Sequence, residues 1–333
     1  MKKCLIVPYF GKFPNYFQLT LNSCGENLDY DWLLFTDNRE KYDYPLNVKV
    51  YHMEFQDFKK IIELKLGKEF NLETPYKLCD YKVAYGFLLE EYIRDYDWWG
   101  YCDIDVIFGK INNFISENLF YDYDKLFILG HFTMFKNTLE INRMFMKPLD
   151  NEILYKKYLT NNKIWVFDER WKKSINNIFE KYEKKIYYKN CIADIYPKSV
   201  KFKIVNSDMT NKTKFIKEQC KGIFIYDNGK IKEIYKENNK IKINEYMYIH
   251  LQKRKMVCDL QEIDKDCYKI IPNKFENLEI ELSEINSKNI KKIKNKEINY
   301  QYIIEWIKYS YIFRKAFTLK KSLYKRLKIN KRS

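Results

Sequence analysis

The sequence predicts an α/β fold built on a mixed, mostly parallel sheet flanked by helices. Short apolar runs at Cys4–Val7 and Trp32–Phe35 have the length and composition of buried strands. Between them Phe17, Leu21 and Cys24 recur at helical spacing, which gives a strand–helix–strand order. That order is typical of parallel strands joined by a crossover helix.

Polar residues follow the first two predicted strands at the point where each strand ends. Pro8–Gly11 turns after the first strand, and Thr36–Asn38 follows the second. Because ligands of open parallel sheets bind beyond the carboxyl ends of the strands, we expect both segments at a binding edge.

The rest of the chain continues the alternation of strands and helices. In chain order we expect a strand at Val48–Tyr51, a helix at Tyr76–Tyr92, a buried strand at Trp98–Gly109, a strand at Phe127–Leu129, mixed helix and loop between residues 140 and 185, a hairpin at 222–235 that turns at Asn228-Gly229, and a strand at Tyr246–Leu251.

We expect one domain over residues 1–280 and an appendage over 281–333. The stretch 281–299 is rich in Lys and Asn, which indicates a linker. An amphipathic helix is expected over 300–328; the segment 301–333 holds ten Lys or Arg, one acid and seven aromatic residues, in a chain of net charge +16. Such a helix is typical of binding to an anionic membrane surface. Alternatively, its apolar stripe packs on the domain or on a second subunit.

The composition excludes several classes of protein. Apolar residues make up 46% and aromatic residues 18% of the chain, so it can bury a core and is not expected to be disordered. The eight cysteines form no CxxC pair, and the apolar run after Lys3 is too short for a signal peptide. No apolar stretch in the sequence is long enough to span a membrane. We therefore expect a cytoplasmic protein, peripheral at most on the inner face of the membrane.

Two acidic residues interrupt the most apolar stretch of the chain, WWGYCDIDVIFG. Asp103 and Asp105 are two residues apart, so on an extended backbone both carboxylates point the same way. Burying two unpaired charges is very costly, so a cation or an opening to solvent is implied. Four other Asp-x-Asp triplets occur, but each lies among polar residues and is expected to be solvated.

One of the three histidines, His250, ends the last predicted strand and directly precedes a basic run. A lone histidine is more often structural, yet two carboxylates with one imidazole suit Mn²⁺ or Mg²⁺ bound together with phosphate oxygens. Lys253 and Arg254 would neutralise a departing diphosphate, although alone they are an ordinary charged run. Together these residues indicate glycosyl transfer from a nucleotide sugar.

The motifs resemble those of metal-dependent glycosyltransferases with the GT-A fold, a Rossmann-type α/β architecture. More closely, the chain is similar to a bacterial family associated with capsule and lipopolysaccharide synthesis. The similar segments fall within residues 1–260, in this order: LIVPYFGKFPNYF, LLFTDN, YKLCDYKVAYGF, YCDIDVIFG, LGHFTMFKN, VFDE, IYDNG and YIHLQKRKM. The resemblance implies transfer of a hexosyl group from a nucleotide-diphosphate sugar, such as a UDP-sugar, to a surface-polysaccharide or lipid-linked acceptor.

The resemblance also implies roles for particular residues on the donor side. Asp103, Asp105 and His250 would bind the metal. The nucleotide would contact a larger set, which is Pro8, Tyr9, Phe10, Thr36, Asp37, Lys77 and Asp80.

On the sugar and acceptor side, the resemblance implies His131, Asp168 and Glu169. An inverting reaction needs a general base beside the acceptor hydroxyl, for which Asp168 or Glu169 is the candidate. A retaining reaction needs no such base, and the sequence does not decide between the two.

Other interpretations are open at three points. Lys77 and Asp80, three apart on a predicted helix, would otherwise form a surface ion pair. A haloacid-dehalogenase-type phosphatase would use Asp103 as nucleophile, although that motif resembles DxDxT/V near the N-terminus and this chain has Ile107 in its last position. A nucleic-acid-binding protein would explain the positive charge, but most of the excess lies in the tail and no binding signature occurs, so no nucleic-acid partner is expected.

Overall fold

The computed structural model describes residues 1–295 except for 71, 170–171, 198, 200, 208–214, 253 and 261–265. Lys253 and the helix predicted over 300–328 therefore lie outside the described residues.

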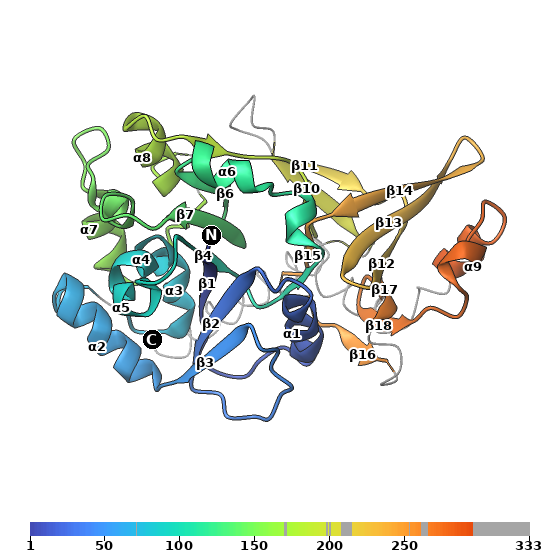
Figure 1. Cartoon of the computed structure of the whole chain (residues 1–333), viewed down its shortest axis with the longest axis horizontal. Helices are drawn as coiled ribbons and strands as arrows, with labels where there is room; N and C mark the ends of the chain where they lie inside the picture. The colour runs from blue at the N-terminus through green and yellow to red at the C-terminus, as the bar shows by residue number, and fades with distance from the viewer. Residues whose placement is uncertain are drawn as a thin grey trace, which may run out of the picture.

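A seven-stranded mixed sheet forms the centre of the molecule (Figure 1). Its strands run in the order β3 (Val48–His52), β2 (Tyr30–Thr36), β1 (Lys3–Pro8), β4 (Trp98–Cys102), β7 (Phe132–Lys136), β6 (Lys125–Leu129) and β8 (Ile186–Tyr187). The first four are parallel, whereas β7 runs antiparallel to both β4 and β6. The mixed α/β class and the four predicted strands within β1, β2, β3 and β6 are confirmed.

Both faces of this sheet are buried, because alternate residues of its central strands enter different apolar cores. In β1, Cys4 and Ile6 face one core, whereas Leu5 and Val7 face the other. The first core is covered by α2 (Phe55–Leu66), α4 (Tyr85–Leu88), α5 (Glu90–Ile93), η4 (Ile141–Met146), α7 (Leu154–Leu159) and α8 (Ile175–Lys181), most of them on the left of Figure 1. The second is covered by α1 (Phe17–Gly25), η3 (Ile111–Asn113) and α6 (Glu117–Asp122). Burial on both faces explains why the strands read as continuous apolar runs.

The segment predicted as one helix over Tyr76–Tyr92 is instead a series of short turns. It consists of η1 (Pro75–Lys77), α3 (Leu78–Tyr81), η2 (Lys82–Ala84), α4 and α5. Adjacent residues such as Val83, Ala84 and Tyr85 are all buried, so the segment packs on more than one face. Tertiary packing therefore sets its backbone and overrides the regular helix that the apolar period indicates.

The stretch Trp98–Gly109 is two strands and not one. β4 ends at Cys102, and β5 (Val106–Phe108) leaves the central sheet to pair with β15 (Tyr248–His250), which in turn pairs with β9 (Ala193–Asp194). Asp103 and Asp105 lie in the turn between β4 and β5, because the chain changes sheets at this point. The strand predicted over Tyr246–Leu251 is confirmed in its central part as β15.

A second, mostly antiparallel sheet forms a lobe on the right of Figure 1. Its order is β14 (Lys240–Tyr246), β13 (Lys230–Glu237), β12 (Ile223–Asp227), β17 (Cys267–Ile271), β18 (Lys274–Asn277) and β16 (Val257–Asp259), and β10 (Lys203–Ser207) and β11 (Phe215–Gln219) form a separate ribbon. The predicted hairpin is confirmed as β12–β13. Its turn residues Asn228 and Gly229 have φ of 45° and 77°, the backbone that an Asn-Gly primed turn requires.

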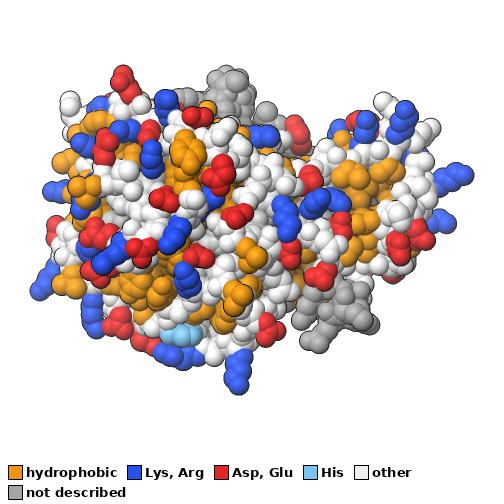
Figure 2. Space-filling view, viewed as in Figure 1, with side chains coloured by type: hydrophobic (Ala, Val, Ile, Leu, Met, Phe, Trp, Pro, Cys, Tyr) orange, Lys and Arg blue, Asp and Glu red, His pale blue; other side chains and the backbone are white. Residues whose placement is uncertain are grey.

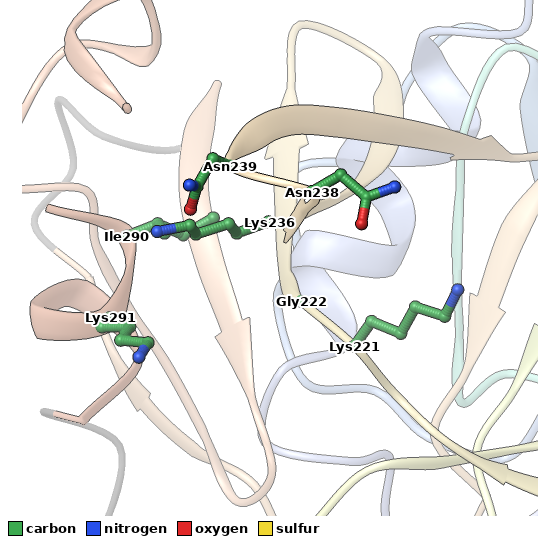
Figure 3. Close-up of a pocket in the computed structure, with 7 residues that line it drawn as sticks. All are labelled: Lys221, Gly222, Lys236, Asn238, Asn239, Ile290 and Lys291. Atoms are coloured by element: carbon green, nitrogen blue, oxygen red, sulfur yellow. The ribbon is translucent and has the colours of Figure 1, made fainter. Parts of the chain in front are cut away.

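Part of the predicted linker packs on this lobe. It contains η6 (Leu282–Glu284) and α9 (Ile290–Asn295), and Ile285 and Ile290 are buried against the isoleucines of β12 and β13. A pocket of about 480 Å³ lies beside α9, where Lys221 points away from Lys291 (Figure 3). Lys236 at this pocket donates to the backbone oxygen of Ser287 at 3.2 Å. Contacts within the lobe therefore occupy this region, and residues 282–293 are not a free linker.

The surface mixes both signs of charge. On the face drawn in Figure 2, acidic and basic side chains are interspersed, so opposite charges partly neutralise one another there. Among the helices of the described residues, none is long and apolar enough to cross a membrane.

We expect Gly86→Ala to destabilise the fold. A Cβ at this residue would lie 2.2 Å from the indole of Trp99, which is buried. Overpacking of this kind costs about 1–3 kcal/mol, measurable as a lower free energy of unfolding in urea. Gly25→Ala is the control, because the ring of Pro45 would lie 3.1 Å away and can shift. Equal losses of unfolding free energy in the two variants would show that the contact between residue 86 and Trp99 is not the cause.

Candidate active site

A large cavity opens where the central sheet meets the small sheet of β5, β15 and β9. Its volume is about 1570 Å³, and its lining includes residues 7–10, 14–16, 102–105 and 129–131 together with parts of 164–169 and 250–256. Two of these segments follow the carboxyl ends of β1 and β4, the edge at which ligands of parallel sheets bind. The structure thus places Pro8, Tyr9 and Phe10 at the cavity, as the sequence predicts.

Asp103, Asp105 and His250 meet in this cavity. Nε2 of His250 lies 3.3 Å from Oδ1 of Asp105 and 3.7 Å from Oδ2 of Asp103. The pairing of β15 with β5 sets this geometry: His250 is opposite Val106, and the backbone N–H of Leu251 donates to the carbonyl of Asp105 at 3.0 Å. Although the acid pair lies in a turn and not in a strand, both carboxylates still reach one imidazole nitrogen.

Asp194, at the end of β9, holds the other side of the His250 ring. Its Oδ1 lies 2.8 Å from Nδ1 of His250 and accepts a bond from Gln252 at 2.9 Å. Burial alone would raise the pKa of Asp194, but His131 and His250 lower it to about 2. A carboxylate on Nδ1 leaves Nε2 to face the acid pair, which is the usual support for a metal-binding histidine. The sequence analysis missed Asp194, although an acid inside the apolar run CIADI is the same signal that identifies Asp103.

His131 packs against His250 beneath the cavity. The two rings are stacked with centroids 4.4 Å apart, and Nδ1 of His131 shares a hydrogen bond with the hydroxyl of Tyr248 at 2.6 Å. Burial and the neighbouring His250 lower the pKa of His131 to about 3, so its ring is neutral at physiological pH. His131 lines the cavity although it is only 5% exposed, and its stacking on His250 also lets it support that ring.

Lys82 is a partly buried cation among these acids. Its Nζ lies 2.5 Å from Oδ1 of Asp103, 3.8 Å from Oδ2 of Asp168 and 2.9 Å from the backbone oxygen of Gly130. Burial opposes the charge, but Asp103 and Asp168 hold the pKa of Lys82 well above its ordinary value. Lys82 was not predicted as a site residue, because a lysine in a helical segment is usually solvated.

Asp168 and Glu169 approach the cavity beside Gly130. Oε2 of Glu169 accepts the backbone N–H of Gly130 at 2.7 Å, and a Cβ on Gly130 would lie 2.4 Å from Oδ2 of Asp168. A larger residue at 130 would therefore displace the Asp168 carboxyl group. Burial raises the pKa of Asp168 to about 8; Lys82 opposes this rise and Glu169 adds to it. A carboxyl group with such a pKa can exchange a proton near neutral pH.

Lys77 and Asp80 form a buried ion pair of 2.8 Å and not a surface pair. Neither residue lines the cavity, so the structure does not place them where the predicted contact with a nucleotide would require them. Asp80 accepts the backbone N–H groups of Trp165 and Phe167, at 3.0 and 3.1 Å. Between them Val166 has a φ of 56°, a strained backbone for a β-branched residue. The pair thus fixes the loop that leads into Asp168.

Three other predicted residues also have structural partners. Thr36 is buried at the end of β2, where its Oγ1 accepts the backbone N–H of Asn38 at 3.1 Å. Oδ1 of Asp37 accepts the backbone N–H of Gly11 at 2.7 Å and so holds the loop after β1, and neither residue lines the cavity. Arg254 borders the cavity, but its guanidinium donates to the backbone oxygens of Pro272, Tyr196 and Ser199. It therefore supports the wall and is not free to pair with a diphosphate.

The donor set of Asp103, Asp105 and His250 fits a divalent cation. One ligand atom from each residue lies within 4.8 Å of the others, and His131, Asp194 and His250 form a second such group. In the second group Nδ1 of His250 is already bonded to Asp194, which makes the first group the better site. Two carboxylates and one imidazole match Mn²⁺ or Mg²⁺.

We expect Asp80→Asn to destabilise the protein, because the charge of Lys77 would be left buried without its partner. Breaking one side of a buried pair costs about 3–5 kcal/mol, measured by urea unfolding at pH 7. Asp57→Asn is a matched control: Asp57 also pairs with a lysine three residues away, at 2.8 Å, but on the surface. A similar loss in both variants would contradict the buried role of Asp80.

We expect Asp194→Asn to weaken Mn²⁺ binding by about 10–100-fold, because the His250 ring loses its charged support. Isothermal titration calorimetry of the intact protein measures the affinity. His52→Gln is the control, since His52 is exposed at the end of β3. Unchanged affinity in Asp194→Asn would show that the metal does not bind through His250.

Residues 5–279 match the model of a protein family described as a family of unknown function (DUF6625). The matched range contains all the residues of the site described above. A search of curated proteins finds no match to the chain.

Proposed function

We propose that the chain, which belongs to this family of unknown function, is a metal-dependent glycosyltransferase that uses a nucleotide-diphosphate sugar. The observation that carries the proposal is the convergence of Asp103, Asp105 and Nε2 of His250 at the carboxyl edge of the parallel strands. A cation at that edge is well placed to bind phosphate oxygens of a ligand in the cavity.

The strand order supports a GT-A-like version of the α/β fold. Four parallel strands, β3-β2-β1-β4, make a Rossmann-type half, and the antiparallel β7 begins the second half of the sheet. The acid pair follows directly after β4, the strand that joins the two halves. The cavity of about 1570 Å³ has room for both a donor and an acceptor group.

The residues on the donor side divide the work of binding. Asp103, Asp105 and His250 would hold the ion, and Asp194 would orient the His250 ring. A bound Mn²⁺ or Mg²⁺ would supply positive charge to the diphosphate as it leaves. Residues 8–10 would border the nucleotide of a donor such as a UDP-sugar. They carry no acid that would repel the diphosphate.

On the acceptor side we assign Asp168 and Glu169 to an acceptor hydroxyl. In an inverting reaction one of them takes the hydroxyl proton as the oxygen bonds to the anomeric carbon and the bond to the diphosphate breaks. In a retaining reaction both would serve only to bind the acceptor. The acceptor class we propose is a surface glycan or a lipid-linked glycan, met at the inner face of the cytoplasmic membrane through residues 301–333.

A phosphatase that uses Asp103 as nucleophile is less well supported. Such a nucleophile needs a carboxylate oxygen free to attack phosphorus. Here Oδ1 of Asp103 is paired with Lys82 at 2.5 Å, and Oδ2 faces His250.

We expect Asp103→Asn and Asp105→Asn each to lower the hydrolysis of a nucleotide sugar by at least about a hundredfold, because the charge that holds the ion is lost. The assay screens UDP-, GDP- and CDP-sugars with Mn²⁺. EDTA should abolish the wild-type activity, and added Mn²⁺ should restore it.

The matched control is Asp122→Asn, from an exposed Asp-x-Asp triplet at the end of α6. Full activity of Asp103→Asn or Asp105→Asn, or wild-type activity that persists in EDTA, would contradict the metal-dependent mechanism.

A further inference from the structure

Lys82 connects two groups of acids that the proposed function uses for different purposes. Its Nζ touches Asp103, a proposed metal ligand, and also lies 3.8 Å from Asp168 on the acceptor side. The Lys82 side chain is 12% exposed, and a third contact to the backbone oxygen of Gly130 fixes its end. A side chain with three partners in fixed directions has little freedom to move elsewhere.

Because of the contact with Lys82, the two carboxylate oxygens of Asp103 have different partners. Oδ1 bonds to Lys82, whereas Oδ2 is the atom that faces Nε2 of His250. Oδ2 is therefore the oxygen available to a cation shared with His250 and Asp105. The pairing with Lys82 restricts Asp103 to a single ligand atom.

We propose that Lys82 is a positioning residue that orients Asp103 for one-oxygen metal binding and couples the metal site to Asp168. The proposal rests on the metal site of the proposed function. Lys82 does not touch the reacting atoms in this assignment; it acts through the two carboxylates that it joins.

If Lys82 has this role, removing its charge changes the affinity for the metal ion in a direction that the loss of a purely structural residue would not. A lysine ammonium beside Asp103 repels a metal ion at the same carboxylate, so Lys82 lowers the affinity of the site while ordering it. Removing the charge should therefore tighten metal binding even though the acids lose their alignment. A residue that merely supports the fold would have the opposite effect when removed.

The test is the affinity of the full chain for Mn²⁺, measured by isothermal titration calorimetry. Lys82→Met should bind Mn²⁺ about tenfold more tightly, the effect expected from removing one neighbouring like charge. Its hydrolysis of a nucleotide sugar should fall, because Asp103 and Asp168 are no longer held together.

Asp168→Asn tests the coupling from the other side. At a pH above the Asp168 pKa of about 8, the substitution removes one carboxylate charge and leaves Lys82 to interact with Asp103 alone, so Mn²⁺ binding should weaken by a factor of about three or more. In the double variant the effect of Asp168→Asn should change, since coupled residues are not additive. Additive effects of the two substitutions would overturn the coupling.

The matched control is Lys125→Met, which removes a buried lysine. Lys125 donates to the backbone oxygen of Phe127 and to Asn176, and burial holds its pKa well below the ordinary value. Its loss should leave the Mn²⁺ affinity within about twofold of wild type, because these partners of Lys125 include none of the proposed metal ligands.

The outcomes separate this inference from the proposed function. Wild-type protein that does not bind Mn²⁺ would contradict the metal site itself. Wild-type protein that binds Mn²⁺ while Lys82→Met binds it equally or more weakly would overturn the role of Lys82 alone. If Lys82→Met does not fold, Asp168→Asn still decides: unchanged or tighter Mn²⁺ binding in that variant would overturn the proposal.

Discussion

The pairing of β15 between β5 and β9 is the constraint on which the site depends. It places His250 opposite Val106 on one side and next to Asp194 on the other. Because side chains alternate along a strand, a slip of one residue would turn the His250 ring away from both acids. Residues far apart in the chain thus meet through the register of a sheet with only three short strands.

Charge compensation within the protein makes this acidic cavity possible. Buried carboxylates are very costly without partners, and the partners here are His250 for Asp105 and Asp194, and Lys82 for Asp103. Asp168, which Lys82 reaches only at 3.8 Å, has the raised pKa. Burial thus raises the pKa of Asp168, whereas the close contacts with Lys82 and His250 outweigh burial at Asp103 and lower its pKa.

Local signals in the sequence were sufficient for much of the fold. Four strands of the central sheet, β1, β2, β3 and β6, and the Asn-Gly hairpin follow from short apolar runs and turn residues, and the structure has them at the predicted places. Periodicity could not show that the chain changes sheets between Cys102 and Val106, because both strands are apolar on either side of the turn. The tail at 301–333 stays a prediction.

A site residue could be predicted only where its type contrasted with its neighbours in the sequence. Asp103 stood out as an acid in an apolar run, but spacing alone could not tell that Lys77 and Asp80 face the interior. Their contribution is indirect: Asp80 binds the peptide groups on both sides of Val166 and stabilises its strained backbone. The backbone conformation at Val166 places Asp168, two residues later in the chain, beside Gly130. A buried ion pair outside the cavity thus positions a carboxyl group within it, a relation that exists only in the folded chain.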